Sequence, residues 1–232
     1  MIDKLIGQLF VRTGDRRTVY QALATLERSE VCQPTHWSRT KSLRDPYSRV
    51  EIDEYIDEST AGSAQGLLYI KRVVPPRYIC AISMSSSDQE SGGASWLCID
   101  SDLRLQREDV WQLVRLTSEL ASSLDVEFGL LDFSFSAASG GSASSGSREH
   151  HALFLERGPS TLHARTFFGP ELMRRLGGID ALARCGLHAV MLSDTVCQAD
   201  LLAEPWQHGS NQLDDARRRA CDCLRASGVF GS

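Results

Sequence analysis

The sequence predicts an α+β protein in which an antiparallel or mixed β-sheet is covered by several helices. Three β-rich runs follow one another in mid-chain through connections too short for a crossover helix, and segments with helical spacing of apolar residues lie on both sides. The 232 residues are 42% hydrophobic and 24% charged, as in ordinary globular proteins. We therefore expect one domain over 1–232.

The first quarter of the chain predicts a strand, a helix, a long connection and a second helix. A short apolar run over 4–12 ends at a Thr-Gly-Asp turn, and the apolar residues of 16–28 recur with helical spacing. The polar segment 33–48 is expected to be a connection. The acidic segment 51–58 carries an i, i+3, i+4 apolar stripe, so we expect a short amphipathic helix with an acidic outer face.

The middle of the chain predicts a meander followed by a helix and a further strand. The β-rich runs cover 66–74, 78–84 and 94–100, separated by a Pro-Pro pair and by a polar stretch. The strongest helical stripe of the sequence follows over 110–124, and 126–135 reads as a strand.

The segment 136–147 is almost entirely Ser, Ala and Gly. It cannot bury enough apolar surface to offset its ordering entropy, so we expect a flexible loop. Structured sequence resumes on both sides, which favours a loop inside one domain, with a domain boundary as the alternative.

The last third predicts two short helices, a hairpin and a final helix. Pro170 and Glu171 suit the first turn of a helix that a Gly-Gly pair ends, and a second helix ends at Gly186. The hairpin is expected over 187–203 with its turn at Ser193-Asp194, and the last helix over 212–226.

Composition and the first residues of the chain exclude several kinds of partner and several cellular locations. A formal net charge of −5 gives no general attraction to nucleic acid or to anionic lipid. The chain contains no run of eighteen apolar residues, and its first seven residues interrupt any signal-peptide core with polar side chains. The seven cysteines are odd in number and partly embedded in apolar runs, so we expect reduced, buried thiols and a cytoplasmic protein.

The motifs that normally mark chemistry are missing from the sequence. It has no Gly-Lys-Ser/Thr phosphate loop, no G-x-S-x-G elbow, no paired CxxC and no HExxH. Cys221 and Cys223 would point about 200° apart on a helix, which does not suit a shared metal. We expect no catalytic residue, cofactor or metal. A Cys- or His-dependent hydrolase with an unrecognised site is the enzymatic alternative. His150 and His151 are expected to face solvent, and His188 to lie at a strand edge.

The acidic helix and one tryptophan are the candidate contact residues. Asp53, Glu54, Asp57 and Glu58 lie in a run without a basic residue, which is either a solvated face or a patch that steers a basic partner. Trp37 lies in a long connection, where it is either a core residue or an exposed interface anchor. Two further tryptophans, at positions 96 and 111, sit in regular patterns and are expected in the core.

Several short motifs together resemble bacterial immunity proteins of polymorphic and type VI secretion toxin systems, the immunity protein 52 group in particular. They are the helix start and end within 168–178, the Glu-Pro-Trp of 204–206, Trp37 followed by the Pro-Tyr of 46–47 and an acidic helix, and the Glu-Phe-Gly of 127–129. The resemblance implies an α+β protein that sequesters a toxin encoded by the adjacent gene, often a nuclease of the restriction-endonuclease fold, by covering its active site or substrate groove. It supplies no catalytic residue. A regulatory or scaffold module without a toxin partner is the remaining alternative.

Overall fold

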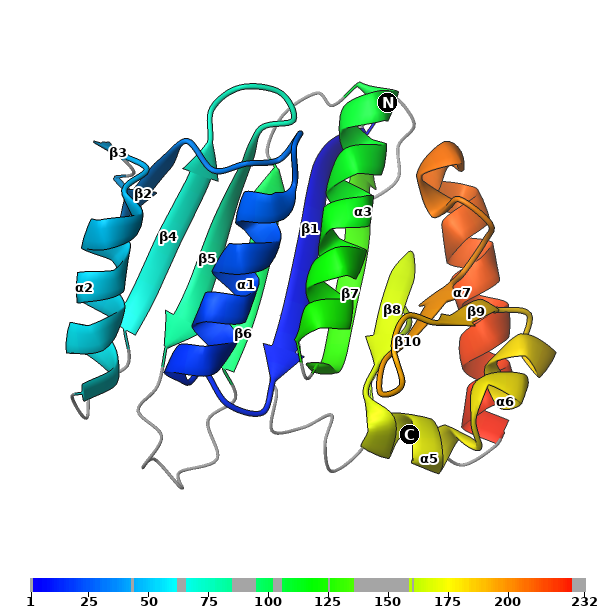
Figure 1. Ribbon diagram of the computed structural model, residues 1–232. Coiled ribbons are helices and arrows are strands. Elements are labelled where there is room, and N and C mark those ends of the chain that lie inside the picture. Colours follow the sequence, from blue (N-terminus) through cyan, green and yellow to red (C-terminus); the bar gives the residue numbers. More distant parts are fainter. Residues whose placement is uncertain are drawn as a thin grey trace.

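The computed structural model describes residues 2–42, 44–61, 66–84, 95–101, 106–124, 126–135, 159 and 161–226 (Figure 1). The strands in these residues are β1 (Ile2–Val11), β2 (His36–Ser38), β3 (Asp45–Pro46), β4 (Gly66–Arg72), β5 (Tyr78–Met84), β6 (Ser95–Ser101), β7 (Val126–Phe135), β8 (Arg165–Phe168), β9 (His188–Met191) and β10 (Cys197–Asp200). The helices are α1 (Arg16–Arg28), α2 (Arg49–Ala61), α3 (Arg107–Ser123), α5 (Pro170–Leu176), α6 (Ile179–Arg184) and α7 (Ser210–Ala226), with a 3-10 turn η1 (Pro205–Gln207).

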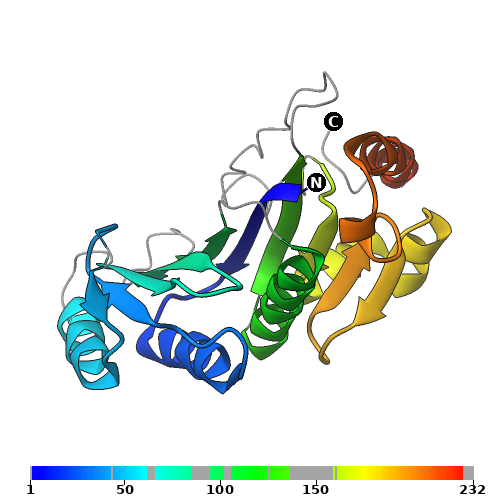
Figure 2. The ribbon, with the colours of Figure 1, turned by 90° about the horizontal axis from the view of Figure 1, so that it is seen from above.

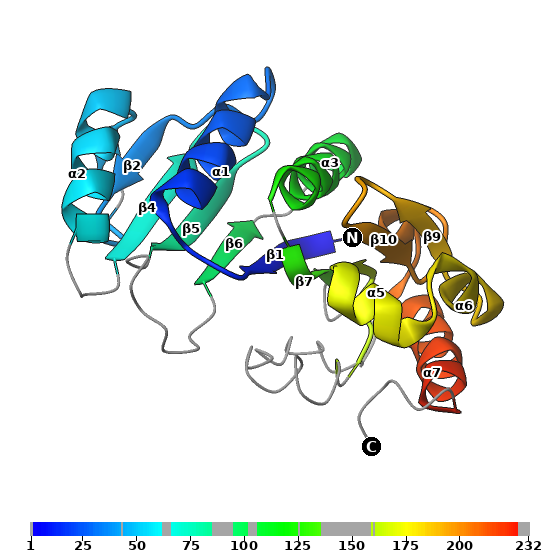
Figure 3. The ribbon, with the colours of Figure 1, turned by 60° about the horizontal axis from the view of Figure 1, so that its bottom comes forward.

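All of these strands belong to one sheet in the order β3-β2-β4-β5-β6-β1-β7-β8-β10-β9, and every neighbouring pair is antiparallel. Helices α1, α2 and α3 cover one face of the sheet, and α7 lies against the opposite face near β7 and β8 (Figure 2). The short helices α5 and α6 lie at the end of the sheet that holds β8, β9 and β10 (Figure 3). The predicted α+β class with an antiparallel sheet is therefore confirmed.

The main core lies between the centre of the sheet and helices α1 and α3. Leu5 and Leu9 of β1 are fully buried beneath α3. Gly7 stands between them, and a Cβ at this position would lie 3.1 Å from Thr117 Cγ2. The absence of a side chain at Gly7 therefore lets α3 approach the central strand closely.

Two of the motifs quoted above for the family resemblance lie side by side in the sheet. In the β7–β8 ladder, Phe128 pairs with Phe168 and Gly129 pairs with Phe167. The Gly169 N–H then donates to the Glu127 carbonyl over 3.0 Å, and a Cβ at Gly169 would collide with the backbone around Glu127. The spacing of both motifs thus has a structural cause, since each segment needs a glycine where the other approaches.

Capping residues and glycines set the ends of several helices. Asp15 caps α1 by accepting a hydrogen bond from the Thr18 N–H over 2.8 Å. Pro170 occupies the first turn of α5, and Gly177 ends that helix in the left-handed conformation with φ of 81°. Gly186, also at φ of 81°, follows α6 as predicted.

Three elements differ from the sequence prediction. β8 was not predicted, because every one of its four residues is buried and the run shows no alternation. β2 and β3 lie within 33–48, which reads as a connection because both strands are only two or three residues long. The hairpin is confirmed, although its second strand is shorter than expected. The Ser/Gly-rich segment 136–147 lies outside the described residues.

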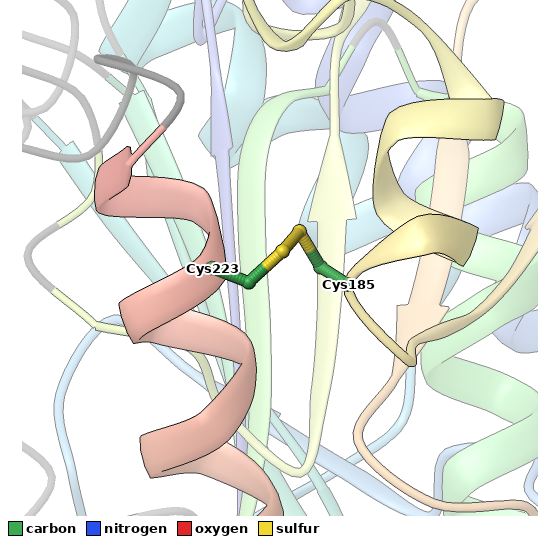
Figure 4. The surroundings of a disulfide bond; sticks show 2 residues. All are labelled: Cys185 and Cys223. Atoms are coloured by element: carbon green, nitrogen blue, oxygen red, sulfur yellow. A yellow bond between two sulfur atoms is a disulfide. The ribbon is translucent and has the colours of Figure 1, made fainter.

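The expectation that all cysteines are reduced is wrong for one pair. Cys185 at the end of α6 and Cys223 on α7 form a disulfide with a Cα–Cα distance of 5.5 Å (Figure 4). They are 38 residues apart in the chain, so nothing in the sequence brings them together. Burial was correctly predicted for four free cysteines, at positions 32, 80, 197 and 221, while the fifth, at position 98, is half-buried. No helix of the described residues is long and apolar enough to cross a bilayer.

A largely buried carboxylate fastens α7 to the sheet. Asp132 of β7 accepts hydrogen bonds from His163 Nδ1 at 2.9 Å, from the Ala164 N–H at 3.1 Å and from Arg217 Nη2 of α7 at 3.2 Å. Burial alone would raise the pKa of Asp132. The hydrogen bond and charge of His163, with the charge of Arg217 and the Ala164 N–H, outweigh burial and hold that pKa below its usual value.

Breaking the Cys185–Cys223 disulfide should destabilise the protein. Because the bond closes a loop of 38 residues, Cys223→Ser should lower the free energy of unfolding by about 4 kcal/mol and Tm on the order of 10 °C. Thermal unfolding with and without a thiol reductant measures the effect. The reductant should act on the wild type and not on the variant, and an unchanged wild-type Tm in reductant would contradict the assignment.

Replacing Asp132 by asparagine should cost about 3 kcal/mol, because it leaves the half-buried Arg217 with only the exposed Asp214 carboxylate. The pKa of Asp132 is lowered in the folded state, so its stabilising contribution is complete above about pH 4 and is lost as the pH falls below that value. Urea unfolding at neutral and acidic pH should show that Asp132→Asn removes part of the acid sensitivity. The matched control is Asp214→Asn, whose exposed carboxylate contacts the same arginine. A cost as large in the control would contradict this prediction.

Candidate protein-binding surface

Most of the negative charge on α2 is used within the molecule. Asp57 Oδ1 lies 3.1 Å from Arg16 Nη2, and Glu58 Oε2 lies 3.0 Å from Arg39 Nη1. Glu54 is exposed and makes no ion pair with the described part of the chain. The acidic run therefore presents less free charge to a partner than its sequence suggests.

The fourth acidic candidate, Asp53, belongs to a network that joins α2 to α1. Arg49 donates to Asp53 Oδ1 and to Glu27 Oε2, each over 2.8 Å. The Tyr47 hydroxyl donates to Glu27 Oε1 over 2.7 Å. Burial, together with the hydrogen bond and charge of Glu27, raises the pKa of Tyr47 well above its ordinary range. This network stabilises the packing of α2 against α1.

Trp37 is a packing residue in β2. Only 6% of its surface is exposed, its Nε1–H donates to Glu51 Oε2 over 3.1 Å, and its ring lies 6.2 Å from that of Tyr55. Of the two roles that the sequence left open for Trp37, the structure places it in the core. The five predicted site residues thus gather around α2, with the tryptophan beneath the surface.

A second surface, which the sequence did not indicate, lies between α1 and α3. Two hollows of ≈580 and ≈420 Å³ share Arg28, Arg115 and Glu119 in their walls. We call these two adjoining hollows the α1–α3 cleft. The remaining lining residues of the larger hollow are Thr25, Ser118, Ser122, Ser123 and Leu192, and those of the smaller one are Ser29, Glu30, Val31, Cys32, Trp111, Gln112 and Leu116.

Trp111 is the large aromatic residue of the α1–α3 cleft. It is 44% exposed, Val31 in the same hollow is 43% exposed, and the Arg115 guanidinium lies 5.7 Å from the centre of the Trp111 ring. The prediction that Trp111 is a core residue is wrong. It stands about 100° around the helix from Val110, which lies on the buried stripe. That offset is the signal that could have revealed it.

Positively charged side chains outnumber negatively charged ones in the larger hollow of the cleft. Arg115 Nε donates to Glu119 Oε1 over 2.7 Å. Arg28 is exposed in the last turn of α1, where its guanidinium donates to the Ala24 carbonyl and to Thr25 Oγ1. It forms no ion pair with any residue that the structure describes. The larger hollow therefore has two guanidinium groups against one carboxylate.

Three of the free thiols do not resemble nucleophiles. Burial raises the pKa of Cys32 and of Cys80, and it raises the pKa of Cys197 to about 11. Such thiols stay protonated at neutral pH, whereas a reactive cysteine is a thiolate. His188 is exposed at the sheet edge, as expected.

The remaining candidates for a hydrolase or metal site are the histidines and the metal-ligating side chains. His163 is bound to Asp132 inside the polar cluster beneath α7. The pair His150 and His151 lies outside the described residues. In the ranges that the structure describes, no three metal-ligating side chains gather.

Comparison with known proteins yields a likeness to a solved structure. No protein-family model matches the sequence, and no curated protein matches it. Among solved structures, the fold is similar to the Pseudomonas aeruginosa T6SS protein PA0821, with a TM-score of 0.56 and 17% sequence identity over 93% of this chain and 72% of that chain. At this identity, the likeness establishes a shared fold.

Truncation of the two tryptophans should separate a surface residue from a core residue. Trp111→Ala should change the free energy of unfolding by less than about 1 kcal/mol, because the side chain is half exposed. Trp37→Ala should cost about 3–5 kcal/mol, because it opens a cavity beside Tyr55. Urea unfolding of both variants measures this contrast. Equal losses would mean that Trp111 is part of the core.

Proposed function

We propose that this chain is an immunity protein of a type VI secretion toxin system, which binds a toxin protein and covers its active site or substrate groove. The observation that carries the proposal is the α1–α3 cleft, where an exposed tryptophan, an exposed valine and two arginines adjoin. Tryptophan and arginine are the residues most enriched among those that dominate protein–protein binding energies.

Two independent likenesses support the assignment to a secretion system. The motifs at 127–129 and 168–178 resemble immunity proteins of such systems, and the fold is similar to that of the Pseudomonas aeruginosa T6SS protein PA0821. The two motif segments are neighbours in the β7–β8 ladder, so they are joint requirements of one fold. A chain that needs both segments is more strongly tied to the family than either segment alone would suggest.

Inhibition by occlusion requires affinity and a fast encounter but no chemistry from the inhibitor. The net charge of −5 repels nucleic acid, which suits a protein that competes with nucleic acid for the groove of a nuclease toxin. Glu54, the acidic residue of α2 without an internal partner, would contribute to the rate of association with a basic toxin surface. The tight contact itself would come from the better-desolvated cleft.

The cytoplasmic location stays a prediction, and the Cys185–Cys223 pair offers its test. Cytoplasmic thiols are kept reduced, whereas disulfides persist in oxidising compartments. A maleimide reagent added to lysed cells under conditions that block exchange should modify both cysteines if the protein resides in the cytoplasm. Protection of both until a reductant is added would place it in an oxidising compartment.

The function is tested by co-expression with the protein encoded by the adjacent gene. We expect that gene product to arrest growth, and growth to be restored when this chain is expressed with it. A tagged form of this chain should purify with the toxin as a stable complex. The chain with Leu9→Asp, which disrupts the core, is the control for expression without a folded binder. Continued arrest with no complex would contradict the proposal.

A further inference from the structure

We propose that the α1–α3 cleft receives a segment of the partner protein in which an acidic side chain is followed by an apolar one. The carboxylate would lie between Arg28 and Arg115, and the apolar side chain would cover Trp111 and Val31. This inference rests on the proposed function, since the partner is the toxin, and it deepens that function by naming the contact surface and the chemistry that the surface recognises.

The ion pairing of Arg28 can be compared with that of the other exposed arginines. Several exposed arginines in the described part of the chain are paired with carboxylates at 2.7–3.1 Å, whereas others, such as Arg17 and Arg184, make no ion pair there. The paired ones are those at positions 12, 16, 39, 115, 174, 218 and 225. Arg28 has no such partner, although it lies beside Arg115 in the wall of a hollow. An incoming carboxylate would supply the missing charge through charge-assisted hydrogen bonds.

The hydroxyl groups of the larger hollow are the next feature of the cleft. Thr25, Ser122 and Ser123 each direct their hydroxyl toward a backbone carbonyl of the protein, at 2.9 to 3.2 Å. Their hydrogen atoms are therefore engaged, and the donors left for a ligand are guanidinium N–H groups. Since those groups favour carboxylate over neutral acceptors, the hollow selects an acidic side chain.

The smaller hollow continues the same surface. Trp111 and Val31 leave 44% and 43% of their surfaces exposed there. Glu30 lines this hollow and not the larger one, so the occupant at this end gains from apolar contact rather than from negative charge. A segment with adjacent acidic and apolar residues matches both ends.

The cleft and the exposed face of α7 provide matched positions for a test. Helices α1 and α3 lie on one face of the sheet and α7 lies on the other (Figure 2). Arg28 and Trp111 line the cleft on the first face, and Arg218 is an exposed arginine of α7. We would measure the Kd of the purified toxin for the wild type, Arg28→Glu, Trp111→Ala and Arg218→Glu. Circular dichroism and Tm establish that each variant is folded.

Arg28→Glu and Trp111→Ala should each weaken binding by about 30-fold or more, as residues at the centre of an interface do. Arg218→Glu should weaken it by less than about 3-fold. Charge reversal of one toxin Asp or Glu to Arg should restore the affinity of Arg28→Glu and should weaken the wild type. Such a rescue identifies the carboxylate that enters the cleft.

Three results would overturn the inference. If the wild type binds the toxin and both cleft variants bind equally well, the cleft is not the contact surface, while the proposed function stands. If the wild type does not bind the toxin at all, the proposed function and this inference both fail. If sedimentation shows that the chain self-associates and that Arg28→Glu abolishes this, the occupant is a second copy of the chain.

Discussion

The central position of β1 is the constraint on which the rest of the structure depends. The first strand of the chain pairs with β6 on one side and with β7 on the other, so it joins the two halves of the sheet. Its residues Leu5 and Leu9 are buried beneath α3, and the absence of a side chain at Gly7 lets that helix approach β1 closely. Because α3 contacts α1 in turn, the register of β1 also sets the geometry of the α1–α3 cleft.

The far end of the sheet contains buried ion pairs beside its apolar core. Arg165 of β8 donates two hydrogen bonds to Asp200 of β10, each over 2.7 Å, and a third to Ser118 of α3 over 2.8 Å. On the opposite face, Asp132 collects its hydrogen bonds from α7 and the start of β8. Such pairs contribute little net stability against an apolar alternative, but a mispaired arrangement would leave a buried charge alone. We therefore regard them as fixing the positions of β8, β10 and α7.

Sequence reasoning recovered the elements whose patterns are local. The helix of 110–124 followed from its apolar stripe, and the short helix at Pro170 from its first-turn residues. It failed where a property depends on distant segments. The buried strand β8 shows no alternation because both of its faces are covered, and the disulfide partners are 38 residues apart. Trp111 lies in a helix that the sequence predicts correctly, but it stands about 100° around that helix from Val110 and so falls outside the buried stripe.

The candidate site shows why charge in a sequence is a weak guide to charge on a surface. The acidic run of α2 stood out because its neutralising partners, Arg16 and Arg39, come from elsewhere in the chain. Arg28 attracted no notice in the sequence, yet it is the arginine left without a carboxylate beside an exposed tryptophan. Recognition depends on the groups that folding leaves unpaired. Arg28 and Trp111 adjoin one another only after β1 has placed α3 beside α1, so the cleft is a product of the tertiary fold and has no motif of its own.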